Sequence, residues 1–190
     1  MRTFIAIELP QEIKAALAKL QEELKQSAAD VKWVAPENIH LTLKFLGEVD
    51  EEKLEGIKTI LDSAAATANA FQMRISSVGA FPTINSARVI WVGIDQGEAE
   101  TKKIATFLEE KIEKLGIPKE DRTFSSHITL GRTRSSLNRQ KLVEVLNNLA
   151  GEFKDESLEF LVGKITLFKS SLSPHGPTYA VLKQADLKTT

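Results

Sequence analysis

Two short stretches of this sequence carry the same arrangement of chemically active side chains. The segments 40–43 (HLTL) and 127–130 (HITL) each place a histidine and a threonine two residues apart, with an apolar residue after each. The chain has three histidines, and two of them stand in this pattern. Residues i and i+2 of a β-strand point to the same face. If each stretch is a strand, it presents an imidazole and a hydroxyl on one face and apolar side chains on the other.

This pair of motifs suits acid–base chemistry at phosphorus. Imidazoles titrate near neutral pH, so two of them can act as general acid and general base. An in-line displacement at phosphorus needs a base on the attacking side and an acid on the leaving side. Hydroxyl groups can donate hydrogen bonds to the non-bridging oxygens. We therefore predict four catalytic residues, which are His40, Thr42, His127 and Thr129.

Four cationic residues lie on or beside the relevant predicted strands and would help to hold a phosphoryl group: Lys44, Arg132, Arg134 and Lys169.

Other kinds of chemistry are less well supported by the sequence. We expect no metal and no cofactor, because the motifs bring no carboxylate and the chain has no cysteine. The sequence also lacks the Gly-x-Ser-x-Gly pattern of serine hydrolases and the phosphate-binding Gly-x-x-x-x-Gly-Lys loop.

The elements that position the motifs follow a similar order in the two halves of the chain. Apolar spacing and turn residues predict helices and strands. In the first half we expect strands at about 2–9, 31–34, 39–46 and 71–78, with helices at 11–26 and 50–66, and a loop that opens at 79–82. In the second half we expect strands at 87–94, 124–133, 158–168 and 178–183, with helices at 97–115 and 138–149.

An offset of 87 residues relates the two halves. It takes His40 to His127, Thr42 to Thr129, Phe4 to Trp91 and Phe81 to Phe168. We therefore predict an α+β fold with two lobes related by a pseudo-two-fold axis. Each lobe is expected to be a mostly antiparallel sheet with two helices, and the lobes to surround a central cleft. We expect residues 1–190 to form a single bilobal domain, with copies at about 1–86 and 87–183 and strands that can be exchanged between them.

Composition sets the outer limits of this interpretation. The chain has 190 residues, of which 42% are hydrophobic and 27% charged, as in ordinary globular domains. The absence of cysteine suggests the reducing cytoplasm, and the start is too interrupted for a signal peptide. No apolar run approaches the roughly 20 residues of a membrane span. A net charge of −1 argues against a protein that wraps long nucleic acid, so we expect any RNA to be held at one end.

Longer segments around the motifs resemble a known family. They include 2–7 (RTFIAI), 38–47 (NIHLTLKFLG), 79–82 (GAFP), 88–93 (RVIWVG), 127–132 (HITLGR), 167–170 (LFKS) and 176–179 (GPTY). Together they resemble the two-histidine (2H) phosphoesterase superfamily, and within it the RNA 2′,3′-cyclic phosphodiesterases, also called 2′-5′ RNA ligases. The chain departs from the family at Ser126, where proline usually precedes the second motif histidine. We expect this change to loosen the backbone there.

The resemblance implies a reaction and further site residues. The reaction is metal-independent opening of a 2′,3′-cyclic phosphate to a 2′-phosphate. His40 would protonate the departing 3′-oxygen and His127 would activate water, although the pseudo-symmetry leaves the order of these roles open. Arg132 would contact the phosphate, and Phe45 would offer a stacking surface for a terminal base. We expect the third histidine, His175, to be a loop residue without a catalytic role.

Three interpretations of function stay open at this point. The first is an RNA 2′,3′-cyclic phosphodiesterase whose partners are RNA or oligonucleotide ends that carry the cyclic phosphate. The second is a 2′-5′ RNA ligase, or a cyclic phosphodiesterase of another small nucleotide. The third is a non-catalytic module that binds RNA ends. None of them requires a membrane or a protein partner, and we expect a cytoplasmic monomer.

Overall fold

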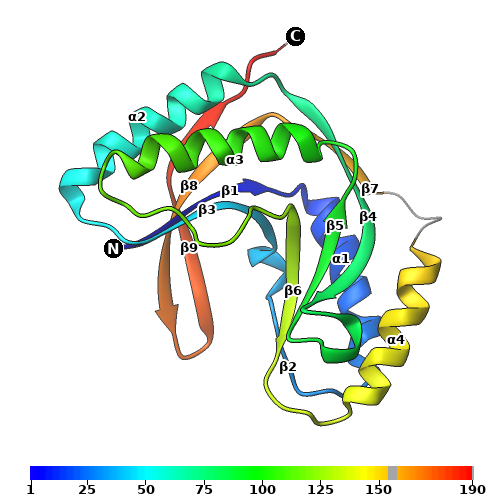
Figure 1. The fold of residues 1–190 in the computed structure, drawn as a ribbon. Helices are drawn as coiled ribbons and strands as arrows, with labels where there is room; N and C mark the ends of the chain where they lie inside the picture. The colour runs from blue at the N-terminus through cyan, green and yellow to red at the C-terminus, as the bar shows by residue number, and fades with distance from the viewer. Residues whose placement is uncertain (154–157, 190) are drawn as a thin grey trace.

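The structure is a computed structural model that describes residues 1–153 and 158–189, and in this part of the chain four helices pack on one antiparallel sheet (Figure 1). The strands are β1 Arg2–Glu8, β2 Val31–Trp33, β3 His40–Glu48, β4 Phe71–Phe81, β5 Val89–Ile94, β6 His127–Thr133, β7 Leu158–Val162, β8 Lys164–Ser173 and β9 Gly176–Asp186. The helices are α1 Gln11–Lys25, α2 Glu51–Thr67, α3 Glu98–Glu113 and α4 Arg139–Glu152, and short 3₁₀ turns lie at Pro36–Asn38 and Ile84–Ser86. None of the described helices is long and apolar enough to cross a membrane.

The sheet consists of two halves that meet at the two motif strands. Its order is β7-β4-β5-β6-β3-β1-β8-β9, and β2 pairs with β6 beside this path. Helices α2 and α3 lie together over the β3–β1–β8–β9 half, whereas α1 and α4 lie over the half that contains β4 (Figure 1). Each half is thus an antiparallel sheet with two helices, as the sequence predicted.

Strands and helices cross between the halves. Strand β4 comes early in the chain but pairs with β5 and β7, and β8 comes late but pairs with β1. One apolar core cluster runs between the sheet and the helices through both halves. The amphipathic spacing of each helix explains this core, since the inward residues of α1 include Ile13, Leu17 and Leu24, all buried.

Several predicted boundaries were wrong, with one main cause. The predicted strand 158–168 is two strands that break at Gly163, because β7 pairs with β4 at one end of the sheet and β8 pairs with β1 near the other. Strand β4 continues to Phe81, so the loop begins later than predicted. Strand β3 likewise continues past Gly47 to Glu48, and β6 begins at His127 and not at residue 124. These ends depend on the pairing partner, which local sequence does not specify.

Candidate active site

The two motifs lie next to each other because their strands pair at one point. Strands β3 and β6 are antiparallel, and Leu41 is paired with Ile128. These two positions are also related by the 87-residue offset, so a local two-fold axis passes through this pair. Both side chains are completely buried in the core. The flanking residues therefore point the opposite way, which places His40, Thr42 and both corresponding residues of β6 on one face.

An irregularity after each motif repeats this symmetry. Between β1 and β3 the register shifts after Thr42, and between β5 and β6 it shifts after Thr129. Such a bulge adds one residue and reverses which later side chains face each way. As a result Phe45 and Arg132 lie on the same face as the histidines. The same offset of 87 relates these two residues, so the candidate base-stacking and phosphate-binding side chains occupy equivalent places in the two halves.

His40 is held firmly by its neighbours. Its Nδ1 atom donates a hydrogen bond to the Asn38 carbonyl at 2.7 Å, and its Nε2 atom is hydrogen-bonded to the Thr42 hydroxyl at 2.9 Å. The imidazole stacks on the Phe4 ring with centroids 4.9 Å apart, and the Tyr179 ring meets it edge-on at 5.5 Å. Asn38 is itself anchored, because its side-chain amide donates to the Pro177 carbonyl at 2.8 Å.

His127 has an equivalent but more open setting. Its Nδ1 atom donates to the Ser125 carbonyl at 2.8 Å, which repeats the contact of the other histidine. The Phe81 ring meets it edge-on at 5.1 Å and packs in turn on Trp91 at 5.0 Å. The hydroxyl of Ser126, just before it, is buried and has no hydrogen-bond partner in the described part of the chain. An orphaned hydroxyl of this kind destabilises the fold, and Ser126 places it directly beside the second histidine.

These contacts decide which imidazole atom can exchange a proton. A carbonyl oxygen can only accept a hydrogen bond, so Nδ1 of His40 and of His127 carries a proton in every state, and Nε2 is the atom that titrates. Burial lowers the pKa of His40 below its ordinary 6.5; the Asn38 carbonyl opposes this shift and the charge of Lys14 adds to it. Burial also lowers the pKa of His127, with a further contribution from Arg132. Both imidazoles therefore favour the neutral form at neutral pH.

The predicted cations are divided between the two faces of the sheet. Lys44 is not at the site: it is buried under α3, where its ammonium donates to the Glu109 carboxylate at 2.8 Å and to the Pro118 carbonyl at 3.4 Å. The bulge is the reason, because it turns this residue away from the histidines. Lys169 alternates with Phe168 and so points to the opposite face from that ring.

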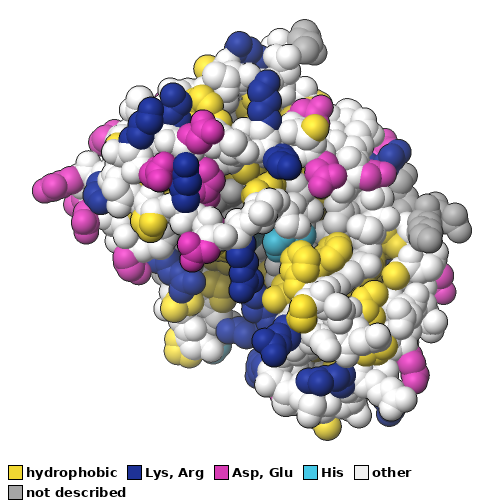
Figure 2. Space-filling view, viewed as in Figure 1, with side chains coloured by type: hydrophobic (Ala, Val, Ile, Leu, Met, Phe, Trp, Pro, Cys, Tyr) yellow, Lys and Arg dark blue, Asp and Glu magenta, His cyan; other side chains and the backbone are white. Residues whose placement is uncertain are grey.

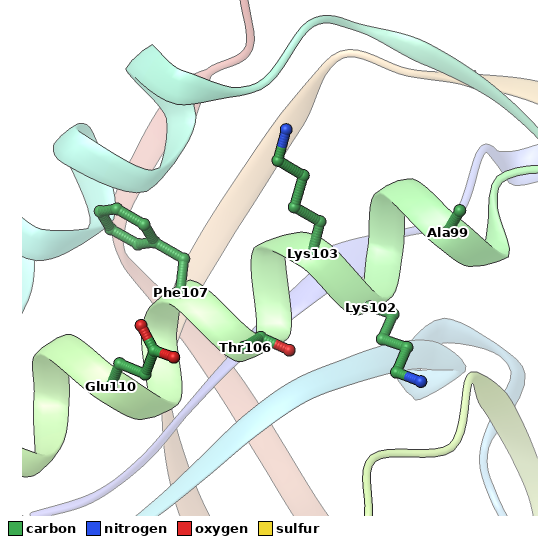
Figure 3. Close-up of a pocket in the computed structure, with 6 residues that line it drawn as sticks. All are labelled: Ala99, Lys102, Lys103, Thr106, Phe107 and Glu110. Carbon is green, nitrogen blue, oxygen red and sulfur yellow. The ribbon is translucent and has the colours of Figure 1, made fainter.

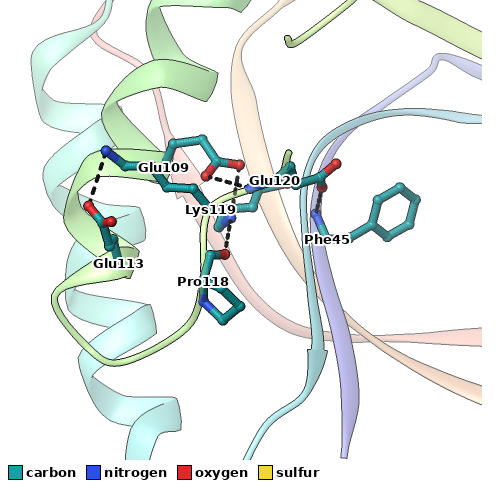
Figure 4. Close-up of polar contacts among 7 residues, drawn as sticks. Phe45, Glu109, Glu113, Pro118, Lys119 and Glu120 are labelled. Atoms are coloured by element: carbon teal, nitrogen blue, oxygen red, sulfur yellow. Dashed lines mark hydrogen bonds and ion pairs between the residues drawn. The ribbon is translucent and has the colours of Figure 1, made fainter. Parts of the chain in front are cut away.

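The loop before β6 is attached to β3 through the same buried pair (Figure 4). The Glu120 amide donates to the Glu109 carboxylate at 3.4 Å, and the Phe45 amide donates to the Glu120 carboxylate at 3.3 Å. The loop leads directly to His127, so the contacts of Lys44 connect the first motif strand with the entry to the second.

Two cations do lie near the second histidine. Arg132 acts electrostatically on His127 and is exposed, and its direct cross-strand partner on β2 is Lys32. Two like charges opposite each other destabilise a sheet unless an anion compensates them. Lys32 was not predicted as a site residue, since only the pairing of β2 with β6 places it there. Arg134 lies just beyond the end of β6, and His175 occupies the exposed turn between β8 and β9.

The surface of the molecule is hollowed at the histidines. Figure 2 shows histidine atoms within a depression, with Lys and Arg side chains gathered below it and hydrophobic side chains beside it. Another shallow hollow follows the outer side of α3 (Figure 3). It is lined by Ala99, Lys102, Lys103, Thr106, Phe107 and Glu110, all on that one helix. It contains neither motif, so the depression at the histidines is the candidate active site.

Comparison with known proteins identifies the family. The family described as LigT like Phosphoesterase matches the chain twice in succession, over residues 7–91 and 92–179. The chain belongs to the LigT-like phosphoesterase family. It is 38% identical to the RNA 2′,3′-cyclic phosphodiesterase of Methanocaldococcus jannaschii, a match that covers 97% of this chain and 99% of that protein. It is 37% identical to the protein of the same name from Archaeoglobus fulgidus, over 96% and 98% of the two chains.

Solved structures of other proteins have the same fold. A crystal structure from Thermus thermophilus matches with a TM-score of 0.79 and 30% identity, and covers 98% of each chain. Escherichia coli LigT complexed with 3′-AMP matches with a TM-score of 0.76 and 26% identity, over 98% of this chain and 97% of that one. The predicted fold class, the predicted family and the predicted enzyme class, a hydrolase of phosphodiester bonds, are confirmed.

Proposed function

We propose that this chain hydrolyses RNA 2′,3′-cyclic phosphate ends to 2′-phosphates by metal-independent acid–base catalysis. The observation that carries the proposal is the Leu41–Ile128 pair, because it turns two imidazoles and two hydroxyls to one face at the junction of the two halves. Relatives named RNA 2′,3′-cyclic phosphodiesterase over nearly the whole chain support the choice of substrate.

The two histidines take the two proton transfers of the reaction. Nε2 of His127, when neutral, removes a proton from water as the water oxygen forms a bond to phosphorus. The bond from phosphorus to the 3′-oxygen breaks, and Nε2 of protonated His40 gives its proton to that oxygen. The product carries a free 3′-hydroxyl and a 2′-phosphate, and proton exchange with solvent restores both imidazoles. Each Nδ1 remains bound to its carbonyl throughout, which keeps the rings oriented.

The remaining polar side chains stabilise charge on the phosphoryl group. The hydroxyls of Thr42 and Thr129 donate to the non-bridging oxygens on the two sides of the local axis. Arg132 and Lys32 supply positive charge beside His127, and the anionic phosphate compensates their mutual repulsion. Phe45, which is 53% exposed on the same face, offers a surface on which the terminal base can stack.

The experiment is to incubate the protein with an oligonucleotide that ends in a 2′,3′-cyclic phosphate, in the presence of a chelator. We expect turnover and a product that ³¹P NMR identifies as the 2′-phosphate. His40→Ala and His127→Ala each lose about 10²–10⁴-fold in rate, the range for general acid–base groups. His175→Ala is the matched control and keeps full activity. Activity that survives His127→Ala, or that requires a divalent metal, would refute the proposal.

A modified substrate separates the acid from the base. A cyclic phosphorothiolate with sulfur in place of the 3′-oxygen has a leaving group that needs no protonation. The His40→Ala variant is expected to regain most of its rate on this substrate, whereas His127→Ala stays inactive. If the rescued variant is His127→Ala, the two roles are reversed.

The other sequence-based interpretations predict different products. A ligase joins the cyclic end to a 5′-hydroxyl strand through a 2′-5′ linkage, which uses the same two proton transfers with the hydroxyl in the place of water. Assays with and without an acceptor strand distinguish the two reactions. A cyclic phosphodiesterase of another nucleotide would prefer a mononucleotide over RNA. The monomeric state and the cytoplasmic location stay predictions from the sequence.

A further inference from the structure

A buried glutamine on α1 reaches the strand of the second motif. Gln21 is 2% exposed and lies on the inward, otherwise apolar face of this helix. Its amide nitrogen donates to the Leu130 carbonyl at 2.9 Å and to the Val34 carbonyl at 2.8 Å. Glutamine side chains are mostly exposed in proteins, and burial of an amide is costly unless it is hydrogen-bonded. Both donors of this amide are used, so the side chain joins β6 to the segment that follows β2.

The carbonyl that Gln21 holds belongs to the bulge of β6. The register of β6 against β5 shifts by one residue after Thr129, which makes Leu130 the extra residue of this bulge. The Leu130 carbonyl also accepts the backbone amide of Val34 at 2.9 Å, and its side chain is completely buried. The bulge brings Arg132 to the face of the histidines. The contacts of Gln21 therefore lie at the position that decides which way Arg132 points.

The same amide fixes the register of the short strand β2. Val34 directly follows this three-residue strand, whose central residue Lys32 is paired with Arg132. The residues on either side of Lys32 pack on the main core, so Lys32 itself points to the other face of the sheet. Like charges at opposite positions of two strands repel each other. A strand as short as β2 therefore needs further contacts to stay in register, and Gln21 supplies one at its end.

The first half of the sheet has an equivalent arrangement. Leu43 is the extra residue of the bulge in β3, and the offset of 87 relates it to Leu130. There Glu109 of α3 binds the ammonium of the adjacent residue, Lys44, at 2.8 Å. Gln21 and Glu109 are themselves 88 residues apart, one more than the offset of the motifs. Each copy thus sends one polar side chain from its first helix to the bulged motif strand of the other copy.

We propose that Gln21 is a positioning residue of the phosphate site, whose amide holds the bulge of β6 against β2 and so directs Arg132 and Lys32 together to the substrate phosphate. It acts through these two cations and not on the substrate, because it is buried between α1 and the sheet. An apolar residue would suit the inward face of α1, but it would leave the bulge without this clamp and the Val34 carbonyl without this donor. The inference rests on the proposed function, in which the two cations hold the phosphoryl group.

The test measures the affinity for the reaction product, a nucleoside 2′-monophosphate, by ³¹P NMR titration. Gln21→Met keeps the length of the side chain and removes its donors. We expect binding to weaken by about tenfold, as on loss of one hydrogen bond from a charged group. KM for the cyclic substrate should rise by the same factor while kcat changes by less than about twofold, because the lost interaction is one of uniform binding. Thr101→Val is the matched control, since this buried hydroxyl donates at 2.7 Å to the Gly97 carbonyl within α3, and it should leave the affinity unchanged.

A double-mutant comparison separates positioning from a general loss of stability. In the Lys32→Gln/Arg132→Gln background, adding Gln21→Met is expected to change the affinity by less than about twofold, because the groups that it positions are gone. An equal loss in both backgrounds, or no loss in either, overturns the inference. If Gln21→Met does not fold, Gln21→Leu takes its place, and failure of both to fold assigns the amide to the fold as a whole and also overturns the inference. A natural protein that binds the 2′-phosphate without hydrolysing cyclic phosphates contradicts the proposed function, whereas the expected pattern of affinities would still support the role of Gln21.

Discussion

Replacing Lys44 by methionine tests whether the buried ion pair holds the loop that leads to the second histidine. The Lys44 ammonium is completely buried and its partner Glu109 is 21% exposed, so the pair is largely removed from water. Methionine fills a similar volume but leaves the carboxylate without its cation. Breaking a buried pair in this way costs about 3–5 kcal/mol, and the partial exposure of Glu109 favours the lower end, about 3 kcal/mol. For a chain of this size that is a fall in Tm of about 6–12 °C.

The assay is urea and thermal unfolding of the natural protein and three variants. Lys44→Met is compared with the double variant Lys44→Met/Glu109→Leu, which removes both charges and is expected to recover most of the lost free energy of unfolding. Lys58→Met is the control, because its 2.7 Å pair with Glu55 lies on the surface of α2 and is expected to contribute less than about 1 kcal/mol.

The Lys44→Met substitution should lower catalytic activity as well as stability, because it disturbs the loop that leads to His127. The Glu109 carboxylate also accepts a hydrogen bond from the Glu120 backbone amide, and the Glu120 carboxylate accepts one from the Phe45 backbone amide. Loss of Lys44 is therefore expected to lower kcat/KM at temperatures where the variant is fully folded. The reasoning is refuted if Lys44→Met costs less than about 1 kcal/mol, or if the double variant is no more stable than the single one.

Further predictions concern the chemistry of the site. Because burial lowers the pKa of both His40 and His127 below 6.5, both limbs of a bell-shaped kcat/KM profile are expected below that pH; a limb above pH 7 in the free enzyme contradicts this. The unfolded chain then binds more protons than the folded one just below pH 6.5, so the free energy of unfolding should fall as the pH drops, and less so in a His40→Gln variant measured by urea titration. Thr42→Val and Thr129→Val should each lower kcat by about 10²-fold, but only Thr42→Val should shift the pH profile, since within the described residues only this threonine bonds to an imidazole. Lys32→Gln is expected to raise KM several-fold and to weaken its dependence on salt, and an unchanged KM would show that this cation does not face the phosphate.

The offset of 87 residues is the sequence feature that predicted most about the candidate site. It identified the two motifs as equivalent, and the structure places the local axis at Leu41 and Ile128, which the same offset relates. The alternation of strand residues then predicts correctly that the histidines and threonines share one face. Fold class, family and enzyme class could be predicted because they depend on short local patterns that occur twice.

The β-bulges after Thr42 and Thr129 change which side chains face the site, and the sequence did not predict them. In a regular strand Lys44 would share the face of His40 and Phe45 would not, whereas the structure has the reverse. A bulge arises from the register with a neighbouring strand, and β1 and β5 lie far from the motif strands in sequence. No local pattern around the motifs records that register, so the positions of these side chains follow only from the assembled sheet.

By itself, the sequence determined the two His-x-Thr motifs, their duplication and the type of each element, because these follow from residue identity and from periodicity within one segment. Only the tertiary structure decided which half each exchanged strand joined, that Lys32 stands opposite Arg132, and that rings from three distant strands line up beside His40. Each of these is a relation between strands, and it is fixed by hydrogen-bond register and shared burial across the sheet. That is the physical reason why the fold class, the family and the enzyme class could be predicted from the chain, whereas the relative positions of these side chains could not.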